Sequence, residues 1–91
     1  MLPPIPFWMR QRQIKVEPMN ETTVALKTPN LPIHELILRP AENGEGYTAA
    51  IYCLPTAGGE RFLVAEKPSG LTEPQSAWQF AFELFRQKVI V

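Results

Sequence analysis

The chain has 91 residues, the length of one small domain with a single hydrophobic core. Apolar residues make up 45% of it and aromatic residues 10%, proportions that exclude an intrinsically disordered chain. Nine basic residues balance nine acidic residues, so no long-range field attracts nucleic acid or anionic lipid. Weak charge repulsion between copies instead favours self-association or a standing partner.

Targeting signals and cysteine usage point to the cytoplasm. Residues 1–9 contain three prolines and no basic residue, which is not the pattern of a secretory signal peptide. No apolar run approaches the ~18 residues of a membrane-spanning helix. Cys53 is the single cysteine, so no intramolecular disulfide can form, as is usual in a reducing compartment. We therefore expect a cytoplasmic protein without a membrane span.

The N-terminal third of the chain is rich in proline. Residues 1–12 are first apolar and then basic, and we interpret them as a tail that precedes a single domain at 13–91. Strict alternation of apolar and polar residues predicts strands at 13–17 and 22–28. A proline-containing break follows at 29–32.

Three further strands are predicted at 34–39, 47–54 and 61–67. Asn43 and Gly44 form the strongest short-range hairpin signal, because both residues tolerate a positive φ. The links between the strands are too short for parallel crossovers, so the strands are expected to form an antiparallel meander.

The C-terminal segment, 72–91, predicts one amphipathic helix. Thr72 occupies the position of an N-cap, and Gln75 follows at the spacing of a capping box. Apolar residues recur at helical spacing and form one stripe, made of Ala77, Trp78, Phe80, Ala81, Phe82, Leu84 and Phe85. Opposite the aromatic members of this stripe we expect the core residues Leu36, Leu38, Phe62 and Val64.

The predicted fold is α+β: an antiparallel β-meander of three to five strands with one C-terminal amphipathic helix packed on one face. A helix covers only one face of a sheet, and the strand at 47–54 is apolar on both faces. Its second face therefore needs a cover, which is either the tail 1–12 or another molecule.

Catalytic, metal and cofactor chemistry are not expected. In the predicted hairpin His34 lies opposite Cys53, but no helix N-terminus or cation close in sequence activates the thiol. One His and one Cys cannot build a structural zinc site, and Glu42 and Glu45 are typical solvated turn residues. The link at 68–72 has one glycine and no following lysine, so no phosphate loop and no small-molecule ligand are evident.

The tail carries the residues that we predict to bind a partner: Ile5, Phe7, Trp8, Met9, Arg10 and Arg12. Large apolar side chains outside any predicted element are typical of interaction sites. We therefore expect a non-enzymatic protein-interaction or accessory module. It would dock through the sheet face and the tail, on another protein or on a second copy as a homodimer.

The alternative function is nucleic-acid binding. Arg10, Arg12 and Lys15 form, with Trp8, the single basic and aromatic cluster, and some DNA-binding domains use a three-stranded sheet. The predicted strands at 34–67 offer few cations among comparable numbers of glutamates, which disfavours this alternative.

Overall fold

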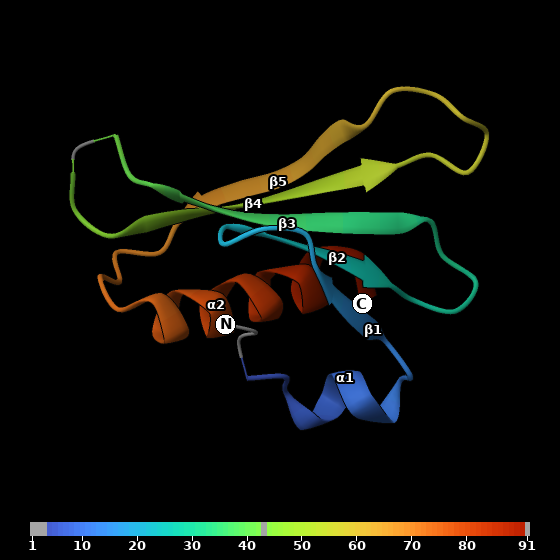
Figure 1. Ribbon diagram of the computed structural model, residues 1–91, viewed down its shortest axis with the longest axis horizontal. Helices are drawn as coiled ribbons and strands as arrows, with labels where there is room; N and C mark the ends of the chain where they lie inside the picture. The colour runs from blue at the N-terminus through green and yellow to red at the C-terminus, as the bar shows by residue number, and fades with distance from the viewer. Residues whose placement is uncertain (1–3, 43, 91) are drawn as a thin grey trace.

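The computed structural model describes residues 4–42 and 44–90. In chain order its elements are helix α1 (Phe7–Gln11), strands β1 (Lys15–Pro18), β2 (Thr23–Lys27), β3 (Ile33–Pro40), β4 (Tyr47–Leu54) and β5 (Phe62–Pro68), helix α2 (Pro74–Phe85) and a π-helical turn η1 (Arg86–Ile90) (Figure 1). The five strands form one antiparallel sheet in the order β1-β2-β3-β4-β5. The predicted α+β meander with a C-terminal helix on one face is confirmed.

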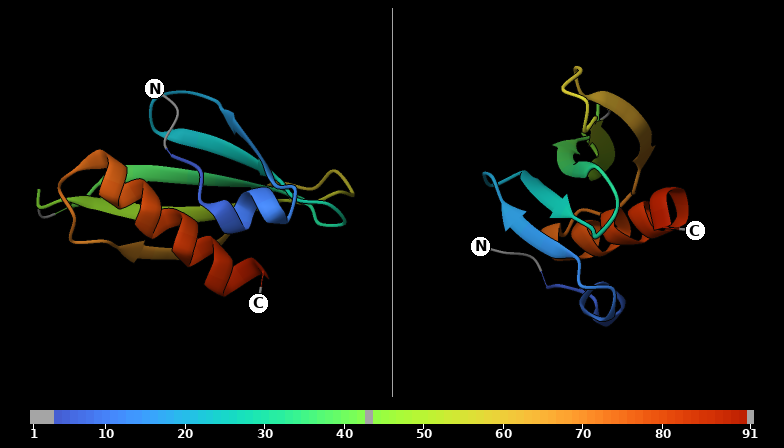
Figure 2. Two further views of the ribbon diagram at one scale, coloured as in Figure 1. Left: turned by 90° about the horizontal axis from the view of Figure 1, so that it is seen from below. Right: turned by 90° about the vertical axis from the view of Figure 1, so that its right-hand side faces the viewer.

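The two faces of the sheet differ, because helices cover only one of them. Helices α1 and α2 both lie on one face, which we call the helix face (Figure 2). Leu36 and Ile51, which lie opposite each other on β3 and β4, point to this face and are fully buried. Side chains one residue along each strand point the other way, toward what we call the open face.

Helix α2 begins later than predicted. Its N-cap is Glu73, not Thr72, and among the described residues no side chain caps the first turn. The reason is Pro74 at the first helical position, because a proline forces the residue before it into the extended region. Glu73 is extended, with ψ 126°, so the helix cannot start earlier. The prediction that Thr72 and Gln75 form a capping box is therefore wrong.

The apolar stripe of α2 forms the centre of the core. Phe82 and Phe85 are fully buried and Trp78 is 7% exposed, as predicted. They pack with residues of β2, β3 and β4, and α2 lies against β4 and β3. The expectation that Phe62 and Val64 of β5 join this core is wrong, since both are exposed. Only Ala65 of β5 packs against the core, half-buried.

A β-bulge explains the position of the β5 side chains. Ile51 pairs with Ala65 but the next residue, Tyr52, pairs with Leu63, so Val64 is an extra residue in the ladder. Such a bulge bends its strand and increases the local twist. Ala65 faces the core, so its neighbour Val64 points away from it, and Phe62 lies beyond the bulge; the predicted contacts with α2 are therefore not made.

The hairpin between β3 and β4 follows the predicted turn as far as the described residues show. Asn43 lies outside them, whereas Gly44 has the expected positive φ of 78°. Gly46 also has a positive φ, and a Cβ built on it would lie 2.6 Å from the Leu71 carbonyl oxygen. The backbone of Tyr47 donates a hydrogen bond to the same oxygen at 3.1 Å. Gly46 thus permits a close approach between the hairpin and the segment that leads into α2.

Candidate protein-interaction surface

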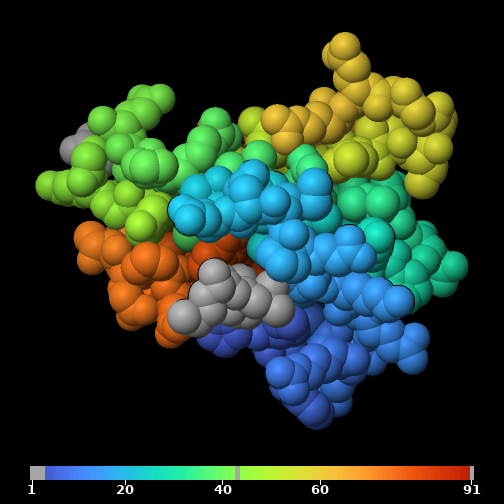
Figure 3. Space-filling view, viewed as in Figure 1, coloured from blue at the N-terminus to red at the C-terminus, as the bar shows by residue number. Residues whose placement is uncertain are grey.

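The segment interpreted as a tail contains helix α1, which packs on the helix face beside α2 (Figures 2 and 3). Met9 is fully buried in the core, and Ile5 and Trp8 are half-buried against it. The Gln79 side chain of α2 donates a hydrogen bond to the Pro4 carbonyl at 3.3 Å. The segment therefore folds back on its own domain, but on the face that α2 already covers.

The predicted partner-binding residues separate into two groups. Ile5, Trp8 and Met9 contribute to the domain's own core, and the Arg86 guanidinium lies 5.6 Å from the centre of the Trp8 ring. The other three residues point outward and are exposed, namely Phe7, Arg10 and Arg12. Phe7 is 72% exposed, the most exposed large apolar residue of the described chain.

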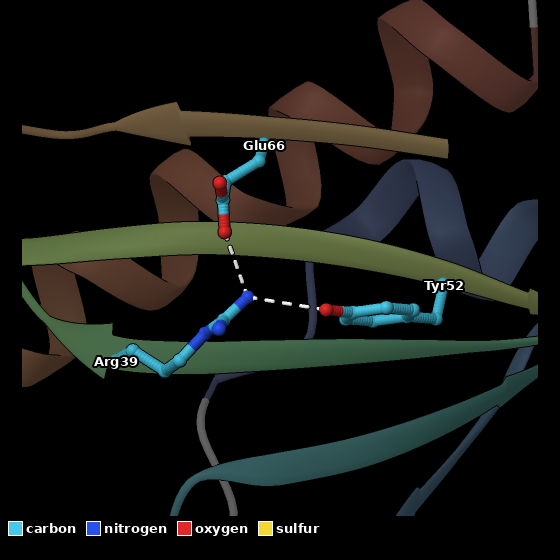
Figure 4. Close-up of polar contacts among 3 residues, drawn as sticks. All are labelled: Arg39, Tyr52 and Glu66. Atoms are coloured by element: carbon cyan, nitrogen blue, oxygen red, sulfur yellow. Dashed lines mark hydrogen bonds and ion pairs between the residues drawn. The ribbon is translucent and has the colours of Figure 1, made fainter. Parts of the chain in front are cut away.

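The open face carries an organised set of polar side chains. Arg39 of β3 reaches across β4 and forms an ion pair with Glu66 of β5 at 2.7 Å (Figure 4). The same guanidinium nitrogen donates a hydrogen bond to the Tyr52 hydroxyl at 3.3 Å. Figure 4 shows these three side chains in front of the sheet, with the helices behind it.

A second ion pair lies on the same face. Arg61, which immediately precedes β5, contacts Glu35 of β3 at 2.8 Å, and its guanidinium lies 4.5 Å from the centre of the Tyr52 ring. Tyr52 is thus held between two arginines, by a cation–π contact at its ring and a hydrogen bond at its hydroxyl. Each arginine of the open face has a glutamate partner, so this face carries little net charge.

One end of the sheet is apolar and exposed. There the start of β3, the end of β4 and the start of β5 lie together, at the right-hand side of Figure 1. We call the five large apolar residues of this region the apolar end; they are Ile33, Leu54, Phe62, Leu63 and Val64. Phe62 is 53% and Leu63 49% exposed, whereas Leu54 is half-buried. Exposed large apolar side chains gathered at one end of a sheet, on either face, are typical of interaction sites.

Sequence reasoning assigned two members of the apolar end to the core. The signal that was available is the run Phe62-Leu63-Val64, since three consecutive large apolar residues in a strand cannot all face one core.

The main-chain edge of β5 is protected against strand addition. The bulge distorts its ladder, Lys67 places a charge beside the edge, and Pro68 lacks an amide donor. At the opposite edge, β1 is four residues long and ends in Pro18, and Glu17 pairs with Lys27 at 3.0 Å. A partner therefore meets side chains at the apolar end rather than free backbone groups.

His34 and Cys53 lie opposite each other, as predicted from the hairpin register. Both are buried, with His34 5% and Cys53 7% exposed. The His34 ring packs edge-on against Phe85, with the ring centres 5.4 Å apart. Burial lowers the pKa of His34, and a hydrogen bond with the Pro32 backbone opposes this shift. This pair is therefore shielded from solvent.

The cations proposed to bind nucleic acid do not share a surface with the open-face arginines. Arg10 and Arg12 belong to α1 and its C-terminal end, on the helix face, whereas Lys15 lies on the edge strand β1. The two open-face arginines are paired with glutamates. These cations and the open-face arginines therefore do not form one basic surface.

Within residues 4–42 and 44–90, no three His, Cys or Glu side chains gather where they could hold a metal ion. No helix in that part of the chain is long and apolar enough to cross a membrane. Comparisons of the chain with protein-family models, curated proteins and solved structures find no match.

Proposed function

We propose that this chain is a non-enzymatic protein-interaction module that docks through the apolar end of its sheet. The observation that supports this function most directly is the exposure of Phe62, Leu63, Val64 and Ile33 beside a charge-paired open face. An aqueous monomer gains nothing from that exposure, whereas association removes these side chains from water. The described part of the N-terminal segment does not cover them, because it packs on the helix face.

The partner that this surface fits best is a second copy of the chain. The chain has zero formal net charge, so two copies meet without electrostatic repulsion. Two charged residues flank the apolar run of β5 and have no ion pair within the described structure: Glu60 before it and Lys67 after it. A two-fold axis reverses the direction of β5 and brings the Glu60 of each copy toward the Lys67 of the other.

A contact at the apolar end also avoids a large desolvation cost. The Arg39–Glu66 and Arg61–Glu35 pairs then lie toward the rim of the contact, where water still reaches them. The apolar side chains occupy its centre, as in most protein interfaces.

The experiment is sedimentation of the full chain over a wide concentration range. We expect reversible dimers whose dissociation constant rises at least about tenfold in Leu63→Glu, since the new charge would be buried in the contact. The matched control is Met19→Glu, because Met19 is 58% exposed and lies in the link between β1 and β2. This control should dimerise like the unchanged chain.

A charge exchange tests the orientation of the two copies. Glu60→Lys alone should weaken the dimer through contact with Lys67 of the other copy, and the double variant Glu60→Lys/Lys67→Glu should restore it. A chain that remains monomeric at high micromolar concentration contradicts the proposal. Binding to a DNA duplex that falls steeply with salt and requires Arg10 and Lys15 would favour the nucleic-acid alternative instead.

A further inference from the structure

The charged residues of this chain are unevenly distributed, although its formal net charge is zero. Helix α1 with its C-cap and the turn η1 contain four of the nine cations and none of the nine acidic residues. These cations are Arg10, Arg12, Arg86 and Lys88. The rest of the chain therefore has an excess of negative charge, and a protein with this separation presents one side to an anionic partner.

Helix α1 and η1 lie side by side and form one surface. Arg12 lines the same shallow depression as Val89 and Ile90 of η1. The Arg86 guanidinium lies 5.6 Å from the centre of the Trp8 ring. Figure 2 shows α1 beside the C-terminal end of the α2 helix. We call the five exposed residues of this region the α1–η1 surface; they are Phe7, Arg10, Arg12, Arg86 and Lys88.

The cations of the α1–η1 surface are available to a partner. Arg10, Arg12 and Lys88 form no ion pair with any described residue. Arg86 contacts the Glu83 carboxylate at 3.7 Å, and both side chains are about half exposed. An exposed pair at this distance is weak, so Glu83 offsets at most one of the four positive charges.

Phe7 adds an exposed aromatic ring to these cations. It is 72% exposed, and Arg10 follows it three residues later, so both side chains lie on one side of α1. Met9 and Trp8 hold the other side of the helix against the core, which keeps Phe7 pointing outward. Figure 3 shows α1 in dark blue at the lower margin of the molecule, where it projects from the body of the domain. Phe7 therefore stands on a convex part of the surface.

Charge and shape together select the kind of partner. A second copy is disfavoured, because a two-fold contact through this surface sets its cations against the same cations of the other copy. Duplex nucleic acid matches the charge but offers a polar, hydrated surface to Phe7. An anionic bilayer supplies both requirements, since its headgroups attract cations and its interface accepts an aromatic ring.

We propose that the α1–η1 surface docks this protein on an anionic lipid bilayer. Arg10, Arg12, Arg86 and Lys88 face the acidic headgroups, and Phe7 enters the interface between headgroups and acyl chains. The apolar end of the sheet belongs to β3, β4 and β5, so the bilayer contact and the proposed dimer contact share no residue.

The test is flotation of the full chain with lipid vesicles on a density gradient. Vesicles of phosphatidylcholine alone are compared with vesicles of equal parts phosphatidylcholine and phosphatidylserine. At low salt the partition coefficient on the anionic vesicles should be at least about tenfold higher. It should fall steeply as the salt concentration rises, because salt screens the attraction between exposed charges.

Variants of single residues assign the contact. Arg12→Gln should lower partition onto the anionic vesicles about fivefold. Its matched control is Lys15→Gln, which removes an exposed cation without an ion pair in the described structure, on a side chain that points to the open face. This control should leave partition nearly unchanged. Thermal melts of each variant separate loss of binding from loss of folding.

The contribution of the aromatic ring is tested in the same way. Phe7→Ser should lower partition severalfold and leave its salt dependence unchanged, because the variant keeps every cation. The matched control is Met19→Ser, since Met19 is 58% exposed and lies in the link between β1 and β2. It should bind vesicles like the unchanged chain.

Several results overturn the proposal. They are equal partition onto the two kinds of vesicle, equal effects of the Arg12 and Lys15 variants, and anionic-vesicle binding that Phe7→Ser does not weaken. Tighter binding of poly-glutamate or of duplex DNA than of anionic vesicles would assign the surface to an acidic protein or to nucleic acid instead. Leu63→Glu, which breaks the proposed dimer, should keep the preference for anionic vesicles, so the two proposals fail separately.

Discussion

At the scale of single residues, the stability of this domain depends on a few positions where a single atom changes the packing or the hydrogen bonding. Gly46 is such a position, because its missing Cβ leaves room for the Leu71 carbonyl. His34 is another, because among the described residues it is the buried polar one. Its Nδ1 atom has no hydrogen-bond partner among the described residues.

Gly46→Ala should destabilise the protein more than Gly44→Ala. Both glycines have a positive φ near 80°, so alanine costs about 1–2 kcal/mol of backbone strain at either position. Gly44 meets no described atom within 4 Å, whereas a Cβ at Gly46 meets backbone atoms of Leu71. Gly46→Ala should therefore lose about 1–3 kcal/mol more unfolding free energy than Gly44→Ala, measured by urea denaturation. Equal losses would show that the hairpin and Leu71 separate easily.

Stability should fall as the pH drops below the ordinary histidine pKa of 6.5. The pKa of His34 is lowered in the folded state, so below pH 6.5 the unfolded chain binds more protons than the folded chain. The stability contributed by the neutral ring is therefore complete above pH 6.5 and is lost as the pH falls toward the folded-state pKa. Urea denaturation between pH 7.5 and 5.5 measures the slope. His34→Gln should abolish it, because His34 is the single histidine; an unchanged slope would assign it to other groups.

At the scale of elements, helix α1 shows how packing rather than propensity can make a helix. Five residues are too few for a helix to be stable alone, and the prolines before it gave no sign of one. The helix exists because Met9 enters the core. It ends at Gln11, and Arg12 is its C-cap.

Two substitutions in α1 test whether the burial of Met9 holds this helix on the domain. Met9→Ala should lower the free energy of unfolding by about 2–5 kcal/mol, since Met9 is fully buried. Phe7→Ala, in the same helix, should change it by no more than about 0.5 kcal/mol, because Phe7 is 72% exposed. Chemical denaturation measures both values. Similar small effects would mean that α1 detaches from the domain in solution.

At the scale of the whole molecule, most of the fold could be predicted because alternation and helical spacing are local properties. The strand at 47–54 and the buried stripe around Phe82 needed no information from elsewhere in the chain. The start of α2 could also have been predicted, since Pro74 forces Glu73 into an extended conformation.

The parts that could not be predicted depend on contacts between distant residues. The run Phe62-Leu63-Val64 shows that its three residues cannot all face the core, but it does not locate the bulge at Val64.

The order of the strands has a consequence for how the chain folds. Each strand pairs with its neighbour in sequence, so every strand pairing closes a short loop and costs little chain entropy. The contact between Pro4 and Gln79 is different, because it joins residues 75 positions apart. We therefore expect the meander to assemble early and the N-terminal segment to dock late. Until that segment docks, the side of the core that receives Met9 is exposed to water. During synthesis the N-terminal residues leave the ribosome first, yet they can dock only after α2 has been made.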